Sequence, residues 1–579
     1  MIEILIVLVL AVGIGWPLGH YIAQVMRGGP APLDRLFGPA ERAIYRLLGV
    51  DARRGMSWKG YAKAFVASNV ALGLLVFAQF MLQARLPLNP DAVPGMSWHL
   101  ALHTMVSFLT NTNQQHYAGQ AQLSYLSQMA GIAGLQVITP MMGLALVVAT
   151  LRGLSGGRAP VSDTAADAAR HGTRADERDV GNYWVDVTRA TLRFFVPLAL
   201  VWTVLLASQG VPATLARGPD IAPLDASAGM KTQHIPLGPV APMVAVKQLG
   251  TNGGGWYGPN SAMPLENPTP FSNLLEVLAI VLVPVAITFM VGPLTGRRKL
   301  TALVFGSMLL MSALSTGAAV WSEAHSHTSH DLALMEGKET RLGASDSALW
   351  AALTTQTSNG SVNAMHDSLA PLTGGVAIAN MLINAIWGGV GCGLQQFLVY
   401  LLLAAFLAGL MTGRTPELFG RKIEAPEIRL LALLVLLQPA VVLGLTALTL
   451  ALPQFAGTSN PGFHGISQVF YEYASAFANN GSGFEGLGDG TPWWNLTCVL
   501  ALLLGRYGAL IVPLAVAGLM AKKRVAPEGA GTLRPETPTF ALTLVCVIVV
   551  LTILQFMPAL VLGPLGEHLA LPATAAALP

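Results

Sequence analysis

Charged residues are scarce in this chain. Only 11% of its 579 residues are Asp, Glu, Lys or Arg, whereas 53% are hydrophobic. An average soluble domain carries about 25% charged residues, so this composition excludes an ordinary soluble protein and indicates an integral membrane protein. The formal net charge of +3 is too small to indicate a nucleic-acid partner, and we expect none.

Cysteine is almost absent as well. Cys392, Cys498 and Cys546 all fall in apolar runs, with no spacing typical of a metal site or a disulfide framework. Small buried side chains are the simpler interpretation of all three.

Nucleotide motifs are also missing. The chain has neither a DKTGT-like motif with a phosphorylatable Asp nor a glycine-rich Walker A loop. The segments expected on the cytoplasmic side reach only about 40 residues, too few for a nucleotide-binding domain. We therefore expect no catalytic residue, no bound nucleotide and no ATP hydrolysis by this chain alone. His366 and Asp367 leave open a membrane hydrolase, although no nucleophile with a second base accompanies them.

Long apolar runs are what the chain has instead. Since about 20 residues cross a bilayer, we predict ten transmembrane helices near 2–25, 63–84, 128–151, 191–208, 273–293, 301–321, 375–411, 428–452, 496–519 and 538–562. Arginines follow the first run rather than precede it, which is the reverse of a secretory signal. Roughly 26 of the 33 Lys and Arg then fall on one side, which is the expected cytoplasmic side. Both termini are predicted to be periplasmic.

Polar, glycine-rich breakers recur four times between these runs. They read TNTNQQ, TNGGG, TSNGS and ANNGS, with Asn113, Gly253, Gly360 and Gly481 at corresponding positions. A semi-apolar stretch of roughly 12–15 residues precedes each breaker, too short to cross a membrane. Each must turn back, and non-helical backbone at that depth needs a protein or watery environment. The sequence predicts four helix, pore-loop, helix units around a common polar axis.

Such turns can surround a cation with backbone carbonyl groups. Glycine permits the required dihedral angles, Asn and Thr can brace the turns, and the C-terminal ends of the half-helices favour positive charge. The breakers contain no carboxylate, which favours a monovalent ion such as K⁺ over Ca²⁺ or Mg²⁺. Two plainer interpretations stay open: Asn359, Asn480 and Asn495 match glycosylation motifs, and the breakers can be ordinary turns.

Several long motifs resemble one known family. FLTNTNQQ, QLGTNGGGWYGPNSAMPLENPTP, AMHDSLAPLTGG, GLMTGRTPELFGRKI, NPGFHG and ANNGSGFEGL stand in the order typical of the bacterial potassium-transporting ATPase A subunit. This resemblance implies a four-stranded K⁺ selectivity filter in the inner (cytoplasmic) membrane, with K⁺ as the transported ion. By position, the strands comprise Asn111, Thr112, Asn113; Thr251, Asn252, Gly253; Ser358, Asn359, Gly360; and Asn479, Asn480, Gly481. Gln115 lies just beyond the first strand, at a position that the family links to K⁺ affinity.

The resemblance also implies partners. A separate P-type ATPase, the B subunit of such a complex, would hydrolyse ATP and receive K⁺ through the membrane, and the small C and F subunits would complete the complex. Membrane lipid is the other expected partner. A self-sufficient K⁺ channel or symporter of the same superfamily is the alternative function.

Three further features invite interpretation. The seventh apolar run is too long for one helix, and we predict one broken crossing rather than two. Four glycines of this run can form a loop that blocks direct passage, as in related transporters, or can serve close helix packing. They are Gly388, Gly389, Gly391 and Gly393.

Arg506 lies well inside a crossing, where charge is costly, and the resemblance places it in the cavity below the filter. Arg414 fits a gate and a cytoplasmic anchor equally well.

These features give an all-α polytopic organisation with the four units flanked by one helix at each end. The predicted boundaries are 1–28 (first helix), 29–62 (cytoplasmic basic segment), 63–152 (first unit), 153–190 (cytoplasmic loop), 191–293 (second unit), 294–411 (third unit), 412–427 (cytoplasmic loop), 428–520 (fourth unit), 521–537 (cytoplasmic loop) and 538–579 (last helix and tail).

Overall fold

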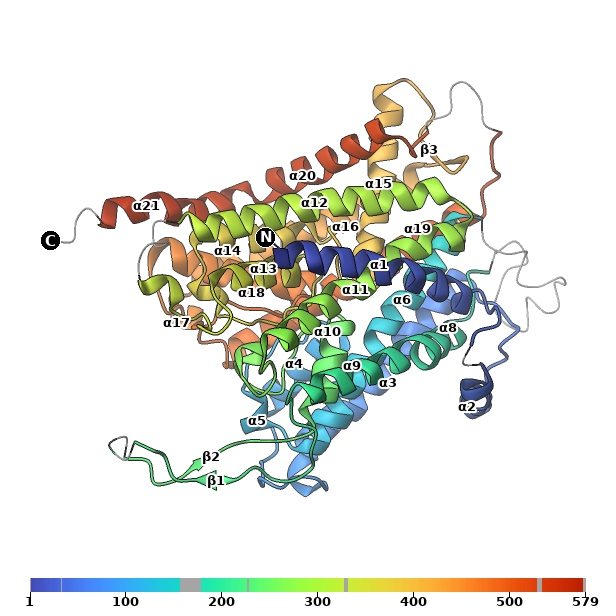
Figure 1. Ribbon diagram of the computed structural model, residues 1–579. Helices are drawn as coiled ribbons and strands as arrows, with labels where there is room; N and C mark the ends of the chain where they lie inside the picture. Colours follow the sequence, from blue (N-terminus) through green and yellow to red (C-terminus); the bar gives the residue numbers. More distant parts are fainter. Residues whose placement is uncertain are drawn as a thin grey trace.

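Helices make up most of the described structure. The computed structural model describes residues 2–32, 34–156, 179–225, 227, 229–326, 332–527 and 534–575. Ten helices in this described part are long and apolar enough to cross a membrane, which confirms the predicted all-α fold with ten spans. Figure 1 shows α1, α12 and α20 running across the molecule in the same general direction. The spanning elements are α1 (Ile2–Met26), α3 (Trp58–Leu82), η2 and α6 (Ser127–Ala133, Gly134–Leu154), α8, η3 and α9 (Tyr183–Arg189, Ala190–Phe195, Val196–Ser208), α11 (Pro270–Thr295), α12 (Arg298–Ala324), α15 (Cys392–Met411), α16 (Ala425–Leu450), α19 (Pro492–Ala521), and α20, η8 and α21 (Pro538–Leu560, Val561–Leu565, Gly566–Ala575).

Polar caps define where several of these helices start. The hydroxyl oxygens of Thr269, Thr491 and Thr537 accept hydrogen bonds from backbone N–H groups in the first turns of α11, α19 and α20. A Pro follows each Thr, where its missing N–H costs nothing because first-turn N–H groups have no intrahelical partner. These helices therefore begin where a Thr-Pro pair meets the apolar run.

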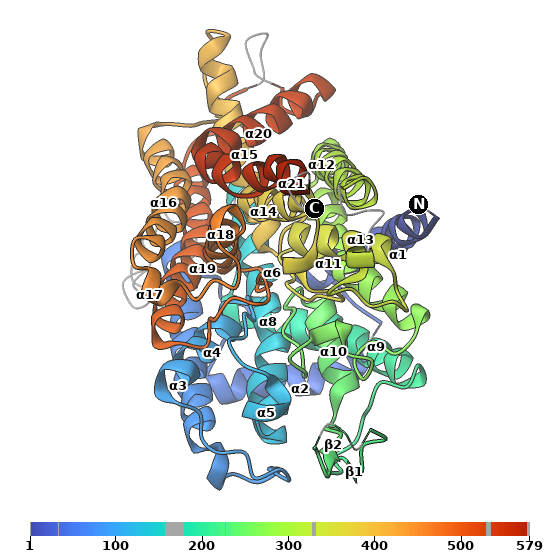
Figure 2. The same ribbon diagram turned by 90° about the vertical axis from the view of Figure 1, so that its left-hand side faces the viewer.

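Four short helices precede the four glycine-rich turns. They are α4 (Trp98–Leu109), α10 (Val240–Leu249), α13 (Ala344–Gln356) and α18 (Gly462–Ala478). Viewed in Figure 2, these helices surround the centre of the molecule in the cyclic order α4, α10, α13, α18, and longer helices such as α1, α3, α16 and α20 lie outside them. The four turns are thus brought together from four distant parts of the sequence.

The seventh apolar run is a broken helix. It consists of α14 (Pro371–Ile383) and α15, separated by residues 384–391, which we call the break loop. Beyond the end of α15, Arg421 donates to the carbonyl oxygen of Leu154 at the end of α6, and Ala526 N–H donates to Gly420. The ends of α6, α15 and α19 therefore lie on one side, as a single broken crossing requires.

Helix α1 packs closely on the buried helix α11 through two glycines. An ideal Cβ at Gly15 would lie 3.0 Å from Val285 Cγ1, and one at Gly19 would lie 2.3 Å from the carbonyl oxygen of Ala286. The four-residue spacing places both glycines on one helix face, the arrangement that lets membrane helices approach closely. The first helix is therefore an integral part of the bundle.

The remaining elements are short. Residues 157–178 of the predicted loop 153–190 lie outside the described residues. The helices are α2 (Asp34–Leu48), α5 (Gly119–Gln122), α17 (Pro453–Ala456), η1 (Gln83–Arg85), η5 (Asn260–Ala262), η6 (Leu332–Met335) and η7 (His366–Ser368), and the strands form two antiparallel pairs, β1 (Asp220–Ile221) with β2 (Gln233–His234) and β3 (Glu417–Leu418) with β4 (Arg421–Lys422).

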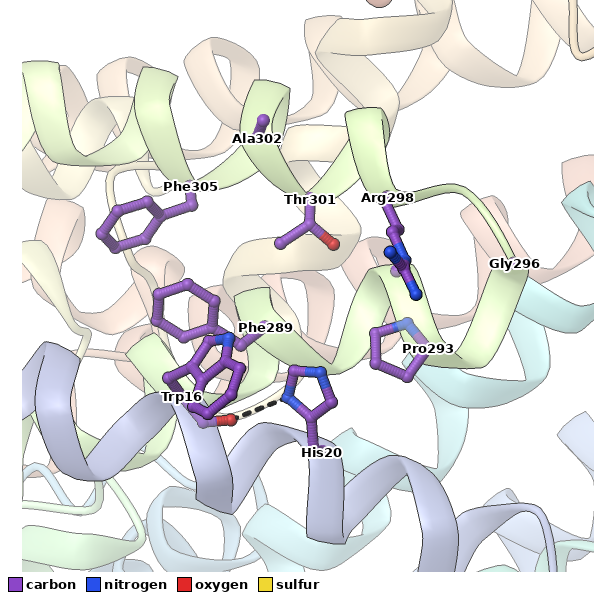
Figure 3. Close-up of a pocket in the computed structure, with 10 residues that line it drawn as sticks. Trp16, His20, Phe289, Pro293, Gly296, Arg298, Thr301, Ala302 and Phe305 are labelled. Carbon is purple, nitrogen blue, oxygen red and sulfur yellow. Dashed lines mark hydrogen bonds between the residues drawn. The ribbon is translucent and has the colours of Figure 1, made fainter.

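A cavity of about 890 Å³ lies between α1, α11 and α12. Figure 3 shows the rings of Trp16, Phe289 and Phe305 toward one end of it and the side chains of His20 and Arg298 toward the other. No residue of the glycine-rich turns lines this cavity. The positive charge of Arg298 makes it an unsuitable site for a small cation.

Candidate functional site

The four glycine-rich turns share one backbone pattern. Each begins with a residue in the left-handed region, continues through a residue with ordinary φ, and returns to positive φ at the third residue. Alternating backbone handedness keeps a strand extended while its successive carbonyl groups turn toward one side. The first residues are Asn111, Thr251, Ser358 and Asn479 (φ 63°, 50°, 50° and 55°), and the third are Asn113, Gly253, Gly360 and Gly481 (φ 59°, 83°, 87° and 102°).

The same hydrogen bond anchors each turn to its short helix. The N–H of the middle residue donates to the carbonyl oxygen five residues earlier in all four units. This bond points the N–H groups toward the short helix. The carbonyl groups of the turn then face the opposite side. The donors Thr112, Asn252, Asn359 and Asn480 bond to Ser107, Lys247, Thr354 and Ser475 at 3.0, 2.9, 2.9 and 2.9 Å.

The turns lie against one another in a closed ring. An ideal Cβ at Gly253 would lie 1.9 Å from the carbonyl oxygen of Asn359 in the third unit. Equivalent positions at Gly360 and Gly481 would each lie 2.1 Å from the next carbonyl oxygen, that of Asn480 and of Thr112. Glycine is therefore required at these positions by both φ and the neighbouring strand.

The first unit closes the ring in a different way, because Asn113 replaces glycine. Asn113 has a Cβ, and an ideal Cβ at Gly254 of the second unit would lie 2.8 Å from it. The extra glycine of TNGGG therefore makes room for Asn113. The amide oxygen of Asn113 also accepts a hydrogen bond from Gln136 of α6 at 2.8 Å, which holds the side chain away from the ring.

Asparagine side chains tie neighbouring turns together. Asn111 Nδ2 donates to the Thr251 carbonyl oxygen at 3.0 Å, which joins the first and second units. The other three junctions use the same chemistry: Asn359 Nδ2 bonds to the Lys247 carbonyl oxygen (3.2 Å), Asn480 Nδ2 to that of Thr354 (2.9 Å), and Asn479 Nδ2 to Thr112 Oγ1 (3.0 Å). These bonds hold the ring at a fixed diameter.

The middle carbonyl groups of the ring have no donor. Among the described residues, no N–H or O–H group donates to the carbonyl oxygens of Thr112, Asn252, Asn359 or Asn480. All four residues are fully buried. More than about 90% of buried carbonyl groups in proteins are hydrogen-bonded, so four unpartnered groups in one ring indicate a ligand that accepts their electron density. A desolvated cation has that property.

Comparison with known proteins assigns the chain to a family. Residues 4–569 match the family model described as the potassium-transporting ATPase A subunit. The chain belongs to this family. Proteins named potassium-transporting ATPase potassium-binding subunit are 44% identical in Gloeobacter violaceus (98% of each chain) and 45% identical in Pseudomonas entomophila (96% of each chain). The fold is similar to the crystal structure of the potassium transporter TrkH from Vibrio parahaemolyticus, with a TM-score of 0.51 and 14% identity over 87% of this chain and 97% of that one.

Gln115 fastens the outer edge of the ring in this family member. Its Nε2 donates to the Gly255 carbonyl oxygen at 3.0 Å, and its Oε1 accepts from Gly255 N–H at 2.8 Å. The first and second units are therefore joined by a two-bond clamp just beyond Asn113 and Gly253.

Replacing Gln115 with leucine should weaken K⁺ binding. The variant loses both bonds, and at about 1 kcal/mol per bond we expect K⁺ affinity to fall roughly 5- to 30-fold. Rb⁺ uptake by the complex at graded concentrations would measure this change. Gln120→Leu is the control, because Gln120 makes a similar bond to Gly258 N–H (2.9 Å) farther from the ring; equal effects of the two variants would contradict a role for the clamp.

The break loop lies directly below the ring. Val390 N–H donates to Thr251 Oγ1 at 2.9 Å, and an ideal Cβ at Gly389 would lie 3.6 Å from Ser358 Cβ. Gly388, Gly391 and Gly393 pack too closely for side chains, since an ideal Cβ at each would lie 2.0–2.1 Å from a neighbouring backbone atom, whereas Gly389 has ordinary space around it.

The two arginines that sequence analysis singled out occupy different environments. Arg506 is buried and donates to the Thr139 carbonyl oxygen at 3.2 Å, and Thr139 Oγ1 in turn donates to Asn111 at 2.8 Å. It therefore lies two contacts from the first strand of the ring. Arg414 is exposed beyond the end of α15, a position that favours the anchor interpretation over a gate.

Sequence analysis missed a buried ion pair behind the second strand. Lys247 and Glu266 are fully buried and bonded to each other, and Lys247 Nζ also donates to Asn260 Oδ1 at 2.6 Å. Asn260 Nδ2 donates to the Gly253 carbonyl oxygen, likewise at 2.6 Å. The Glu266 carboxylate is therefore enclosed and paired with Lys247. The signal available in the sequence was Lys247 itself, a charged residue within a semi-apolar stretch, which indicates a buried partner.

Glu485, which follows the fourth turn, is half-buried. Its carboxylate accepts hydrogen bonds from the backbone N–H groups of His366 (2.6 Å) and Asp367 (3.3 Å). Burial raises the pKa of Glu485 to about 8, so this group is largely uncharged near neutral pH and cannot collect cations there.

Proposed function

We propose that this chain is the K⁺-binding and K⁺-translocating subunit of an ATP-driven import complex. The ring of four unpartnered middle carbonyl groups supports this proposal most strongly. Asn111, Thr112, Asn113 and their counterparts in the other units would form the filter, and Gln115 would brace its outer edge. The four turns contain no Asp or Glu, which favours a monovalent cation over Ca²⁺ or Mg²⁺. The curated relatives carry K⁺ binding in their names.

The break loop and Arg506 would prevent direct passage to the cytoplasm. The loop closes on the inner residues Thr251 and Ser358, and a buried guanidinium group near the first strand repels a cation that leaves the ring. An ion held above this barrier would have to leave sideways. That route leads to a partner P-type ATPase, the B subunit, with the C and F subunits completing the complex in the bacterial inner membrane and both termini of this chain in the periplasm.

ATP hydrolysis would belong to the partner, because this sequence lacks both nucleotide motifs sought above. A hydrolase built on His366 and Asp367 finds no support in the geometry. His366 Nδ1 bonds to the Tyr471 hydroxyl at 2.9 Å, whereas Asp367 Oδ1 bonds to His464 and Gln468 at 2.8 Å each. The two side chains serve different neighbours and do not form an acid and base pair.

Reconstitution separates the importer from a self-sufficient channel or symporter. We expect proteoliposomes containing the whole complex to accumulate Rb⁺ only with ATP, and proteoliposomes containing this chain alone to show little flux. Comparable Rb⁺ flux through the chain alone, without ATP, would favour the channel or symporter and overturn the assignment.

A further inference from the structure

A second cluster of polar groups lies beside the ring, between the first and fourth units. His116 follows the first turn, Glu472 belongs to α18, and Asp489 precedes α19. His116 Nε2 lies 3.2 Å from Glu472 Oε1 and 4.0 Å from Asp489 Oδ2. One ligand atom from each of these residues lies within 4.8 Å of the other two. The cluster is outside the ring, and ion conduction as described above does not use it.

Hydrogen bonds around the cluster fix which nitrogen of the His116 ring carries a proton. Asn495 Nδ2 bonds to His99 Nδ1 at 2.8 Å, so the amide oxygen of Asn495 faces His116 Nδ1, also at 2.8 Å. Only a protonated Nδ1 can donate to that oxygen. In the neutral ring, Nε2 then carries a lone pair directed at the two carboxylates. A positive charge between them relieves this repulsion, either a proton on Nε2 or a bound metal ion.

The spacing suits a small divalent ion. Two ligands each about 2.1 Å from a tetrahedral zinc ion lie roughly 3.4 Å apart, and the two distances from His116 Nε2 bracket this value. The hydrogen bond from His116 Nδ1 to Asn495 resembles the outer-shell bonds that orient histidine ligands. We propose that His116, Glu472 and Asp489 bind a transition-metal ion such as Zn²⁺, with a water molecule as the fourth ligand.

A second observation comes from His103. Its ring stacks on that of His116 with centroids 3.8 Å apart, it is fully buried, and its Nδ1 has no hydrogen-bond partner. His103, His116 and Cys498 form another group whose ligand atoms lie within 4.8 Å of one another. Imidazole and thiol groups so close to the carboxylates favour Zn²⁺ over Ca²⁺ or Mg²⁺, which prefer oxygen ligands alone.

The site is reachable and connected to the ring. The side chain of Asp489 is 31% exposed, against 2% for Glu472 and 0% for His116, so an ion can arrive past Asp489. Gln114 Nε2 donates to Glu472 Oε1, and the Gln114 carbonyl oxygen accepts from Ser107 Oγ at 2.8 Å. The Ser107 carbonyl oxygen anchors Thr112 and Asn113. A metal ion that binds the Glu472 carboxylate would weaken the hydrogen bond that this carboxylate accepts from Gln114 and lower K⁺ affinity at the ring, a consequence that rests on the proposed function.

Titration of the metal-stripped, purified complex with ZnCl₂ tests the site by calorimetry, without any transport measurement. We expect one bound Zn²⁺ per complex, no binding of Mg²⁺ at the same concentration, and an affinity at least tenfold lower in Asp489→Asn, because loss of a ligand should cost no less than loss of an outer-shell partner. Co²⁺ should give the visible absorption of a tetrahedral site. Asp225→Asn, at an exposed carboxylate near the β1–β2 hairpin, should bind as the unchanged complex does.

Each outcome of this experiment is decisive for the site. Asp489 is partly exposed, so Asp489→Asn should fold, and His116→Gln gives a second test through a buried ligand. Absence of Zn²⁺ binding, or equal Zn²⁺ affinity in the unchanged complex and Asp489→Asn, would overturn the site. Zn²⁺ binding without any change in Rb⁺ uptake would keep the site and overturn only its coupling to the ring.

Discussion

Gly360→Ser should lower K⁺ affinity about 10- to 100-fold and reduce the preference for K⁺ over Na⁺. The added Cβ would lie 2.1 Å from the Asn480 carbonyl oxygen and 3.0 Å from Gly481 Cα, both backbone atoms of the next strand. At φ 87° a side chain also adds about 1–2 kcal/mol of backbone strain. The third and fourth strands must therefore separate, and the carbonyl spacing that sets ion preference changes. Competition of Na⁺ with Rb⁺ uptake, measured on the complex, gives both quantities.

Gly343→Ser is a matched control for this variant. Gly343 precedes α13 in the same unit and has a φ of 89°, but no atom lies within 4 Å of its ideal Cβ position. It therefore carries the backbone strain without the collision. If Gly360→Ser and Gly343→Ser had the same K⁺ affinity and Na⁺ competition as the unchanged complex, the ring would not be the ion site.

Lys247→Met should destabilise the chain by about 3–5 kcal/mol, because it leaves the Glu266 carboxylate buried without its cation. The variant also frees Asn260, which bonds to the Gly253 carbonyl oxygen, so K⁺ affinity should fall in the protein that still folds. The double variant Lys247→Met, Glu266→Gln should recover most of the stability, since no unpaired charge remains. Thermal unfolding in detergent and K⁺-dependent stabilisation would measure the two effects separately.

A second buried pair separates stability from ion binding. Lys338 Nζ lies 3.1 Å from Glu323 Oε1, with both side chains at most 2% exposed, and neither residue bonds to the ring. Lys338→Met should cost similar stability while K⁺ stabilises the remaining folded protein normally. Equal loss of K⁺ stabilisation in Lys247→Met and Lys338→Met would show that the Lys247 network has no specific connection to the ring.

Features that repeat along the chain could be predicted from the sequence. Ten apolar runs predicted ten spans, and four breakers in register predicted that Asn113, Gly253, Gly360 and Gly481 would be equivalent. Their backbone dihedral angles have this equivalence in the structure. Glycine scarcely tolerates replacement where positive φ and close backbone approach coincide, so such positions are visible in a single sequence.

Pairings between distant side chains could not be predicted. His116 meets Glu472 across 356 residues, and nothing local in the sequence indicates that contact. The second glycine of TNGGG was equally obscure, because Gly254 is explained by its close approach to Phe108 and Asn113 of another unit. Burial of the Lys247–Glu266 pair could not be predicted for the same reason: the two residues lie on opposite sides of the second turn, and their burial depends on packing rather than on local polarity.

A density map of the whole complex in Rb⁺ would test the central claim most directly. We predict strong density on the axis of the ring, between the carbonyl oxygens of Thr112, Asn252, Asn359 and Asn480, and its replacement by weaker density when Rb⁺ is exchanged for K⁺. A map in which the four turns lie apart, with no ion between these oxygens, would contradict the account.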